Sequence, residues 1–208
     1  MEIQNHKEEV PFSYYAAQFQ TVDPQEVCRR TGAEFRDGAF HVTLLGTEYT
    51  IGWPEYTITA ANGAFALNNL PCQTFLLRFL LNGKKAAASN LYQTFREMPW
   101  GELYIGPYTG RCLKRAAFTF GGRLPAFRAA CEAMGAMAVA HGDAGYQFDF
   151  IGGYRMQLMI YAGDEEFPPS SQILYTDNFA DGFSAEDRVV AGDILISAIR
   201  QQMERSKR

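Results

Sequence analysis

The sequence predicts an α+β fold, a single domain over residues 1–208 in which a largely antiparallel sheet packs against four to six helices. Two stretches, 34–60 and 146–175, alternate apolar and polar residues with the period of two that a half-buried strand requires. Elsewhere apolar residues recur at helical spacing, and no regular βαβ order is evident, which argues against a parallel sheet. We expect frayed ends at residues 1–8 and 204–208.

Two helices open the chain. Residues 8–20 place apolar side chains on one face of a helix. Asp23-Pro24 then combines a capping carboxylate with a proline suited to a first helical turn, and Gly32 ends this second helix. The first alternating stretch follows as a meander, with a hairpin turn at Asp37-Gly38.

The helix predicted from Pro71 to Gly83 is almost entirely apolar. Its polar residues form one narrow line, at steps of four: Thr74, Arg78 and Asn82. We therefore expect it to be the most buried helix of the protein. Residues 84–106 show few periodic signals and are predicted to form an irregular, aromatic-rich connection.

Helices are predicted again at about 107–118 and 124–138. They carry the main basic cluster of the chain, which we interpret as a solvated helix face: Arg111, Lys114, Arg115, Arg123 and Arg128. A hairpin over 146–160 and a short strand at 173–175 come next. Ser184 followed by Asp187, a carboxylate variant of the capping box, begins the last helix.

Composition limits the possible partners. The 208 residues, 47% of them hydrophobic, suffice to bury about 70% of the unfolded surface in one core. Nineteen basic and twenty-three acidic residues give a net charge of −4, so nucleic acid is not an expected partner. We find no secretory signal and no apolar run long enough for a membrane span, and we expect a cytoplasmic protein without membrane contact.

The cysteines are widely spaced along the chain: Cys28, Cys72, Cys112 and Cys131. No close pair can hold zinc or an iron–sulfur cluster, and we interpret all four as reduced thiols of the core. The three histidines lack a ligand at fixed spacing as well. The sequence therefore predicts no metal site from these residues and leaves any cofactor unknown.

Residues 163–170 are the most informative stretch, because three consecutive carboxylates precede a phenylalanine and two prolines. Asp164, Glu165 and Glu166 offer hard oxygen ligands for magnesium or calcium, or an acid and base pair. The alternative is structural: Asp164 caps a turn, and the other carboxylates are solvated or pair with Arg155 or Arg188.

Phe167 is expected to point inward as an ordered packing element. Proline fixes φ and restricts the residue before it, so the Phe167-Pro168 segment has little freedom to lose on folding. An inward Phe167 would hold the preceding carboxylates in a fixed direction, which is how the turn would become a site.

Four segments carry a resemblance to a known family: 95–101 (FREMPWG), 163–170 (GDEEFPPS), 173–175 (ILY) and the helix start at Glu186-Asp187. Together they resemble the prokaryotic domain-of-unknown-function family 3786, over about residues 12–200. The resemblance implies an uncharacterised prokaryotic domain and transfers no catalytic residue. Some larger relatives join this domain to a cysteine-rich iron–sulfur segment, for which the cysteine spacing here is unsuitable.

The first functional hypothesis is a non-catalytic or accessory module that binds a small molecule or a partner protein. Its candidate ligand-binding residues lie in residues 163–170, which we call the acidic turn, in the aromatic loop around Trp100 and after the last strand: Asp164, Glu165, Glu166, Phe167, Trp100 and Asp177. The alternative is a divalent-metal-dependent, hydrolase-like enzyme that uses the acidic turn. A purely structural interaction domain is a third possibility. The sequence assigns no catalytic residue and no oligomeric state.

Overall fold

The structure, a computed structural model, describes residues 9–61, 69–87 and 89–206. Its first half contains these elements: α1 (Glu9–Phe19), α2 (Pro24–Thr31), β1 (Glu34–Arg36), β2 (Ala39–Leu44), β3 (Thr47–Gly52) and β4 (Thr57–Ala60). The signals around α2 are confirmed, because the Asp23 side chain accepts a hydrogen bond from the backbone N–H of Gln25 and Gly32 closes the helix at a φ of 76°.

The middle of the chain departs from the sequence prediction. It contains α3 (Leu70–Asn82), β5 (Tyr92–Thr94), α4 (Gly101–Tyr108), the π-helix η2 (Thr109–Lys114) and α5 (Arg115–Phe120), of which the last three form one continuous helix. The expected irregular connection thus holds a strand and most of α4. Pro107 lies inside the helix instead of starting it. Leu103, four residues earlier, is exposed, so water can satisfy the carbonyl that proline cannot reach.

The last part contains α6 (Leu124–Ala133), β6 (Met137–Ala138), β7 (Ala144–Ile151), β8 (Tyr154–Tyr161), β9 (Ser170–Thr176), α7 (Phe179–Gly182) and α8 (Ala185–Arg205). α6 is shorter than predicted because Gly135, at a φ of 74°, ends the helix and sends the chain into β6. α8 includes Glu204 and Arg205, which were expected to fray. The expected frayed ends at 1–8 and 207–208 lie outside the described residues.

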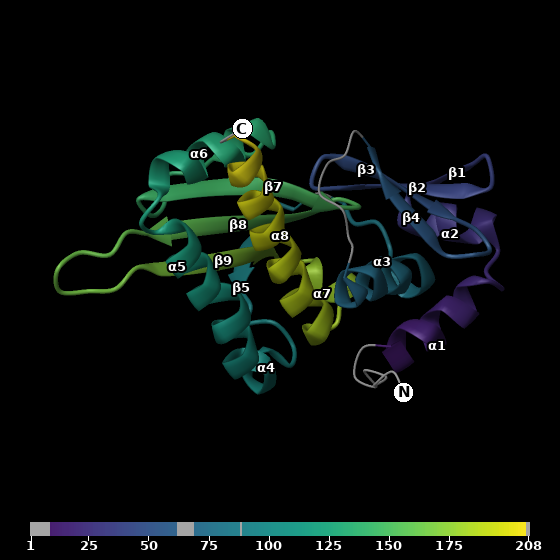
Figure 1. Ribbon diagram of the computed structural model, residues 1–208. Helices are drawn as coiled ribbons and strands as arrows, with labels where there is room; N and C mark the ends of the chain where they lie inside the picture. Colours follow the sequence, from purple (N-terminus) through teal and green to yellow (C-terminus); the bar gives the residue numbers. More distant parts are fainter. Residues whose placement is uncertain (1–8, 62–68, 88, 207–208) are drawn as a thin grey trace, which may run out of the picture.

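The described strands form one nine-stranded sheet in the order β4-β3-β2-β7-β8-β9-β5, with β1 beside β2 and β6 beside β7 (Figure 1). Every described pairing is antiparallel. The α+β class with an antiparallel sheet is therefore confirmed. Six continuous helices of eight or more residues accompany this sheet in the described ranges, together with the four-residue α7.

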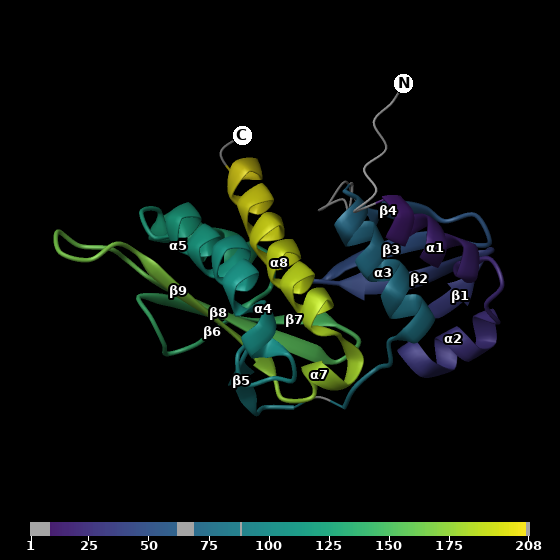
Figure 2. The same cartoon turned by 90° about the horizontal axis from the view of Figure 1, so that it is seen from below.

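One face of the long strands is covered and the other is polar. α4, α5 and α8 lie on the same side of β7, β8 and β9 (Figure 2). Phe148 and Leu158 are buried, whereas Asp149 is exposed and pairs with Arg155 at 2.7 Å. Alternation in the middle of β7 and in the first half of β8 thus separates a core face from a solvent face.

α8, not α3, is the most buried of the described helices. Thirteen of its 21 residues are buried, compared with six of 13 in α3. The reason is position: α8 packs against α3, α4, α5, η2 and α6 and crosses the sheet, so helices flank it on several sides. The polar residues that α8 leaves partly exposed include Asp193, which pairs with Arg111 of η2 and with Arg115 of α5. These two members of the predicted basic cluster therefore join helices as well as meeting solvent.

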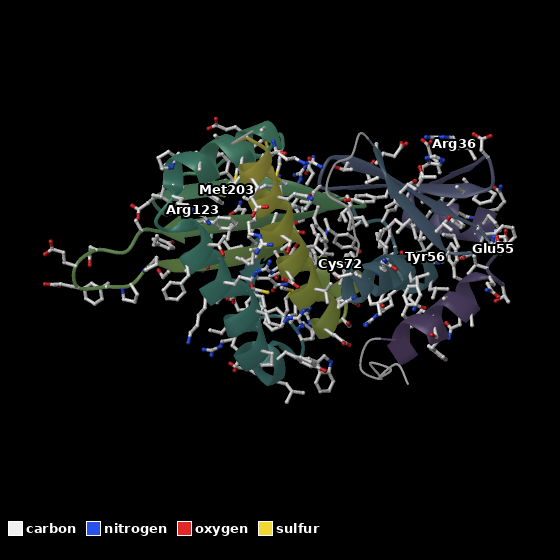
Figure 3. The ribbon with its side chains drawn as sticks, in the orientation of Figure 1. Arg36, Glu55, Tyr56, Cys72, Arg123 and Met203 are labelled. Carbon is white, nitrogen blue, oxygen red and sulfur yellow. The ribbon has the colours of Figure 1, made fainter. Side chains whose placement is uncertain are left out.

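An aromatic group fixes α1 against the first strands and α3. Tyr56, labelled in Figure 3, donates a hydrogen bond from Oη to the carbonyl oxygen of Gln73 in α3. Its ring meets Phe12 and Phe19 of α1 edge to face, at 5.7 Å in both cases. No helix within the described ranges combines the length and apolar character needed to cross a membrane.

Candidate functional site

The acidic turn is a local structure at the tip of the β8–β9 hairpin, which extends beyond the helices (Figure 1). Asp164 Oδ1 accepts hydrogen bonds from the backbone N–H groups of Glu166 and Phe167, at 2.9 and 2.7 Å. The Asp164 N–H in turn donates to the Phe167 carbonyl oxygen. Asp164 therefore caps a turn, as the structural alternative proposed.

The inward orientation expected for Phe167 is wrong, since its side chain is 66% exposed. Glu165 and Glu166 are exposed too. The hairpin reaches past the core here, so no apolar surface is available to receive the ring. Pro169 is the residue that approaches the body, against Gly121 after α5. The rigid back wall expected for an acidic site is absent from this turn.

Asp177 lies at the opposite end of β9 from the acidic turn. Seven residues of extended strand separate the two, which corresponds to roughly 20 Å. The Asp177 N–H donates to the carbonyl oxygen of Leu91, so its backbone extends the β5–β9 pairing. The Asp177 carbonyl oxygen accepts from the side-chain amide of Gln93. The structure does not bring Asp177 and the acidic turn together.

Trp100 belongs to a cleft instead. The cleft has a volume of about 470 Å³ and lies between α3, the loop before α4, and the α7–α8 junction. We call it the Trp100 cleft and define it by these lining residues: Tyr15, Arg78, Phe79, Asn82, Pro99, Trp100, Ala180, Asp181, Gly182, Phe183, Ser184, Ala185, Asp187 and Arg188. Of the sequence-predicted site residues, only Trp100 lines it.

The loop that carries Trp100 is anchored on both sides. Phe95 stacks on Tyr108 with ring centroids 4.0 Å apart, and Met98 is buried. Trp100 adopts a φ of 65°, in the left-handed region, directly before α4. Its side chain is 73% exposed. The result is a large aromatic ring at the edge of the cleft, on a backbone that packing holds in place.

Arg78 connects three helices at the cleft. Its Nη2 donates to Ser184 Oγ at 2.8 Å and to Asp187 Oδ2 at 3.0 Å. Its guanidinium carbon lies 5.6 Å from the ring centroid of Tyr15 in α1. Arg78 is one of the few polar residues of α3, and this contact explains its presence in an otherwise apolar helix.

Asp187 and Ser184 form the predicted capping box of α8. Ser184 Oγ donates to Asp187 Oδ2 at 2.7 Å and accepts from the Asp187 N–H at 3.2 Å. Burial raises the pKa of the Asp187 carboxyl, against the opposing effects of Arg78 and of the hydrogen bonds from Ser184. The Asp187 carboxylate therefore interacts with Ser184 in the helix cap and with Arg78 in an ion pair.

Arg188 is the unusual group of the cleft, because its side chain is almost fully buried, with 1% exposed. Nε donates to the carbonyl oxygen of Ser184 at 3.2 Å, and Nη2 donates to that of Pro99. Nη1 is buried and has no hydrogen-bond partner among the described residues. Burial lowers the pKa of Arg188, although an arginine remains protonated at physiological pH.

Two pairings proposed from the sequence are wrong. Arg155 pairs with Asp149, and Arg188 donates to backbone carbonyls near Trp100, so neither serves the acidic turn. Sequence reasoning missed Arg188 as a site residue, because the residue type alone does not show whether an arginine is buried or exposed. The one available signal was its place directly after the capping box, in the first turn of a mostly buried helix.

The fold and the cleft together define an α+β protein with an open antiparallel sheet and a preformed, charged cleft beside a helix N-terminus. The chain belongs to the family described as "Domain of unknown function (DUF3786)", whose model matches residues 23–198. No significant match was found to a curated protein or to a solved structure.

Proposed function

We propose that the protein is a non-catalytic or accessory module that binds a small molecule in the Trp100 cleft. The observation that carries the proposal is the combination of an exposed Trp100 on an anchored loop with a cleft whose charged groups are already held in place. Its volume of about 470 Å³ falls in the range of small-molecule sites, roughly 300–1,000 Å³. Little ordering is then required when a ligand binds.

The non-catalytic part of the proposal rests on the state of the cleft's buried carboxylate. Asp187 is bound by Ser184 and by Arg78 and would have to leave both to act as a base. The metal-enzyme alternative requires at least three converging oxygen ligands. Within the ranges that the structure describes, no three histidine, cysteine or acidic side chains form such a group. No observation favours that alternative.

The proposal also includes a reducing, cytoplasmic and prokaryotic setting. Four cysteines without a disulfide support the reducing environment. The prokaryotic origin rests on the sequence resemblance carried by residues 95–101 and 163–170. Nucleic acid stays outside the proposal because the net charge is −4.

Trp100 itself provides the test. The chain has two tryptophans, so a Trp53→Phe variant reports the fluorescence of Trp100 alone. A library of small acids, bases and neutral aromatics should contain compounds that shift this emission in a saturable manner. The same compounds should lose affinity in Trp100→Ala, followed by calorimetry, and keep it in Phe118→Ala, an exposed aromatic outside the cleft. A library without any such compound would contradict the proposal.

A further inference from the structure

The two arginines that line the Trp100 cleft are both engaged within the protein. Arg78 Nη2 lies 3.0 Å from Asp187 Oδ2 in an ion pair. The Arg188 side chain is closed to solvent, donates to two backbone carbonyls and lies 5.5 Å from the ring centroid of the buried Phe95. A ligand that enters the cleft therefore finds no free positive charge on either side chain.

The N-terminus of α8, which borders the cleft, is compensated as well. Glu186 and Asp187 stand in the first turn of this helix, where carboxylates offset the partial positive charge of the helix end. Glu186 Oε2 also lies 3.4 Å from Arg78 Nη1. The charges on this side of the cleft therefore balance one another.

Asp181 is the charged residue of the cleft that lacks such a partner. It belongs to α7, lines the cleft and is exposed. Its backbone N–H donates to the carbonyl oxygen of Asn178, but its carboxylate takes part in no hydrogen bond or ion pair among the described residues. The accessible charge that remains uncompensated in the cleft is therefore negative.

The ring of Trp100 is also free. It is 73% exposed, and within the described ranges no aromatic ring packs on it and no arginine or lysine lies over it. Tyr15 and Phe95, by contrast, each lie close to one of the two arginines. The face of a tryptophan ring attracts a positive charge and offers apolar contact as well.

We propose that the ligand of the Trp100 cleft is a small organic ammonium ion. Its positive charge faces the carboxylate of Asp181, and its carbon body lies against the ring of Trp100. The inference rests on the proposed function, since it names the class of small molecule that the cleft binds. A carboxylate and an aromatic face both favour a cation over a neutral molecule of the same shape.

Three probes that share a benzyl or phenyl body and differ in charge test this in the wild-type chain: benzylamine, benzyl alcohol and benzoate, compared by calorimetry at pH 7. We expect benzylamine to bind about tenfold more tightly than benzyl alcohol, as the gain of one charge-assisted hydrogen bond predicts. Benzoate should bind most weakly, because Asp181 repels it. Benzyl alcohol or benzoate that binds as tightly as benzylamine would overturn the ammonium assignment and leave the proposed function standing.

Asp181→Asn locates the binding charge, because it removes the carboxylate at nearly constant size from an exposed position. This variant should lose about tenfold in affinity for benzylamine and keep its affinity for benzyl alcohol. Glu165→Gln is the matched control, since it removes one negative charge from the acidic turn, outside the cleft, and should leave both affinities unchanged.

The outcomes separate the inference from the proposed function. Unchanged benzylamine binding in Asp181→Asn would contradict the role of this carboxylate. Equal losses in Asp181→Asn and Glu165→Gln would contradict it too, because benzylamine would then respond only to the overall charge. Equal urea unfolding midpoints for wild type and Asp181→Asn are expected and exclude a structural cause. A complete lack of binding in the library described above would contradict the proposed function itself.

Discussion

Gly192 of α8 lies directly against Cys112 of η2: a Cβ atom at position 192 would stand 2.9 Å from the cysteine sulfur. Real Cβ atoms do not approach other atoms so closely, so the two helices meet here because residue 192 has no side chain. Gly192→Ala should therefore destabilise the protein by about 1–3 kcal/mol through overpacking, measured by urea unfolding.

Gly110→Ala is the matched control for this substitution. Gly110 lies in η2, as Cys112 does, but a Cβ atom at position 110 would have nothing within 4 Å. Alanine favours helices over glycine, so this variant should be unchanged or slightly more stable. Equal unfolding midpoints for both variants would show that η2 and α8 can separate without cost.

The native thiols should react slowly. Burial raises the pKa of Cys72 to about 11 and that of Cys112 to about 12, and Cys131 is shifted upward for the same reason. At pH 8 these groups are neutral, and a thiol must ionise to react. A disulfide reagent should first label the half-buried Cys28, and unfolding should release the other three. Rapid labelling of Cys112 in the native protein would contradict its placement.

The ion pair between α8 and η2–α5 should matter more than an exposed pair. Asp193 accepts from both Arg111 and Arg115 and is only 25% exposed. Asp193→Asn should cost about 1 kcal/mol, because two arginines lose a partner in a half-buried position. Glu204→Gln, which removes an exposed pair with Arg200, should stay within about 0.5 kcal/mol. Similar losses from both in denaturant unfolding would mean that the Asp193 contacts are ordinary surface pairs.

Truncation of Leu77 should destabilise the protein far more than truncation of Phe167. Leu77 is fully buried in α3, so Leu77→Ala should cost about 2–5 kcal/mol by leaving a cavity. Phe167 is 66% exposed at the hairpin tip, so Phe167→Ala should change stability by less than about 0.5 kcal/mol. Denaturant titration of both variants compares them directly. A large loss from Phe167→Ala would restore the inward packing that the sequence suggested.

The sequence was most informative where a few neighbouring residues decide the structure. Asp23 and Gly32 bound α2, and Ser184 with Asp187 begins α8, because a cap depends only on groups within one turn. The helix predicted at about 107–118 begins earlier, at Gly101, because the solvation that tolerates Pro107 inside it comes from the surrounding surface.

Burial was harder to predict than helix or strand. Phe167 is apolar and exposed, whereas Arg188 is charged and buried, and both depend on where the sheet and helices place them. Trp100 was identified because it stands in an aromatic loop with few periodic signals. Arg78 and Arg188, which line the same cleft, could not be identified as site residues from the sequence, because α3 and α8 are far apart in sequence and meet only in the folded chain.

The sheet described above has short outer strands. β4 and β5, at the two ends of the strand order, contain four and three residues. The eight-residue strands β7 and β8 lie inside the order, where neighbours take their hydrogen bonds on both sides. An edge this short offers another chain few backbone groups to pair with, so the same order of strands that builds the core also protects the protein against edge-to-edge aggregation.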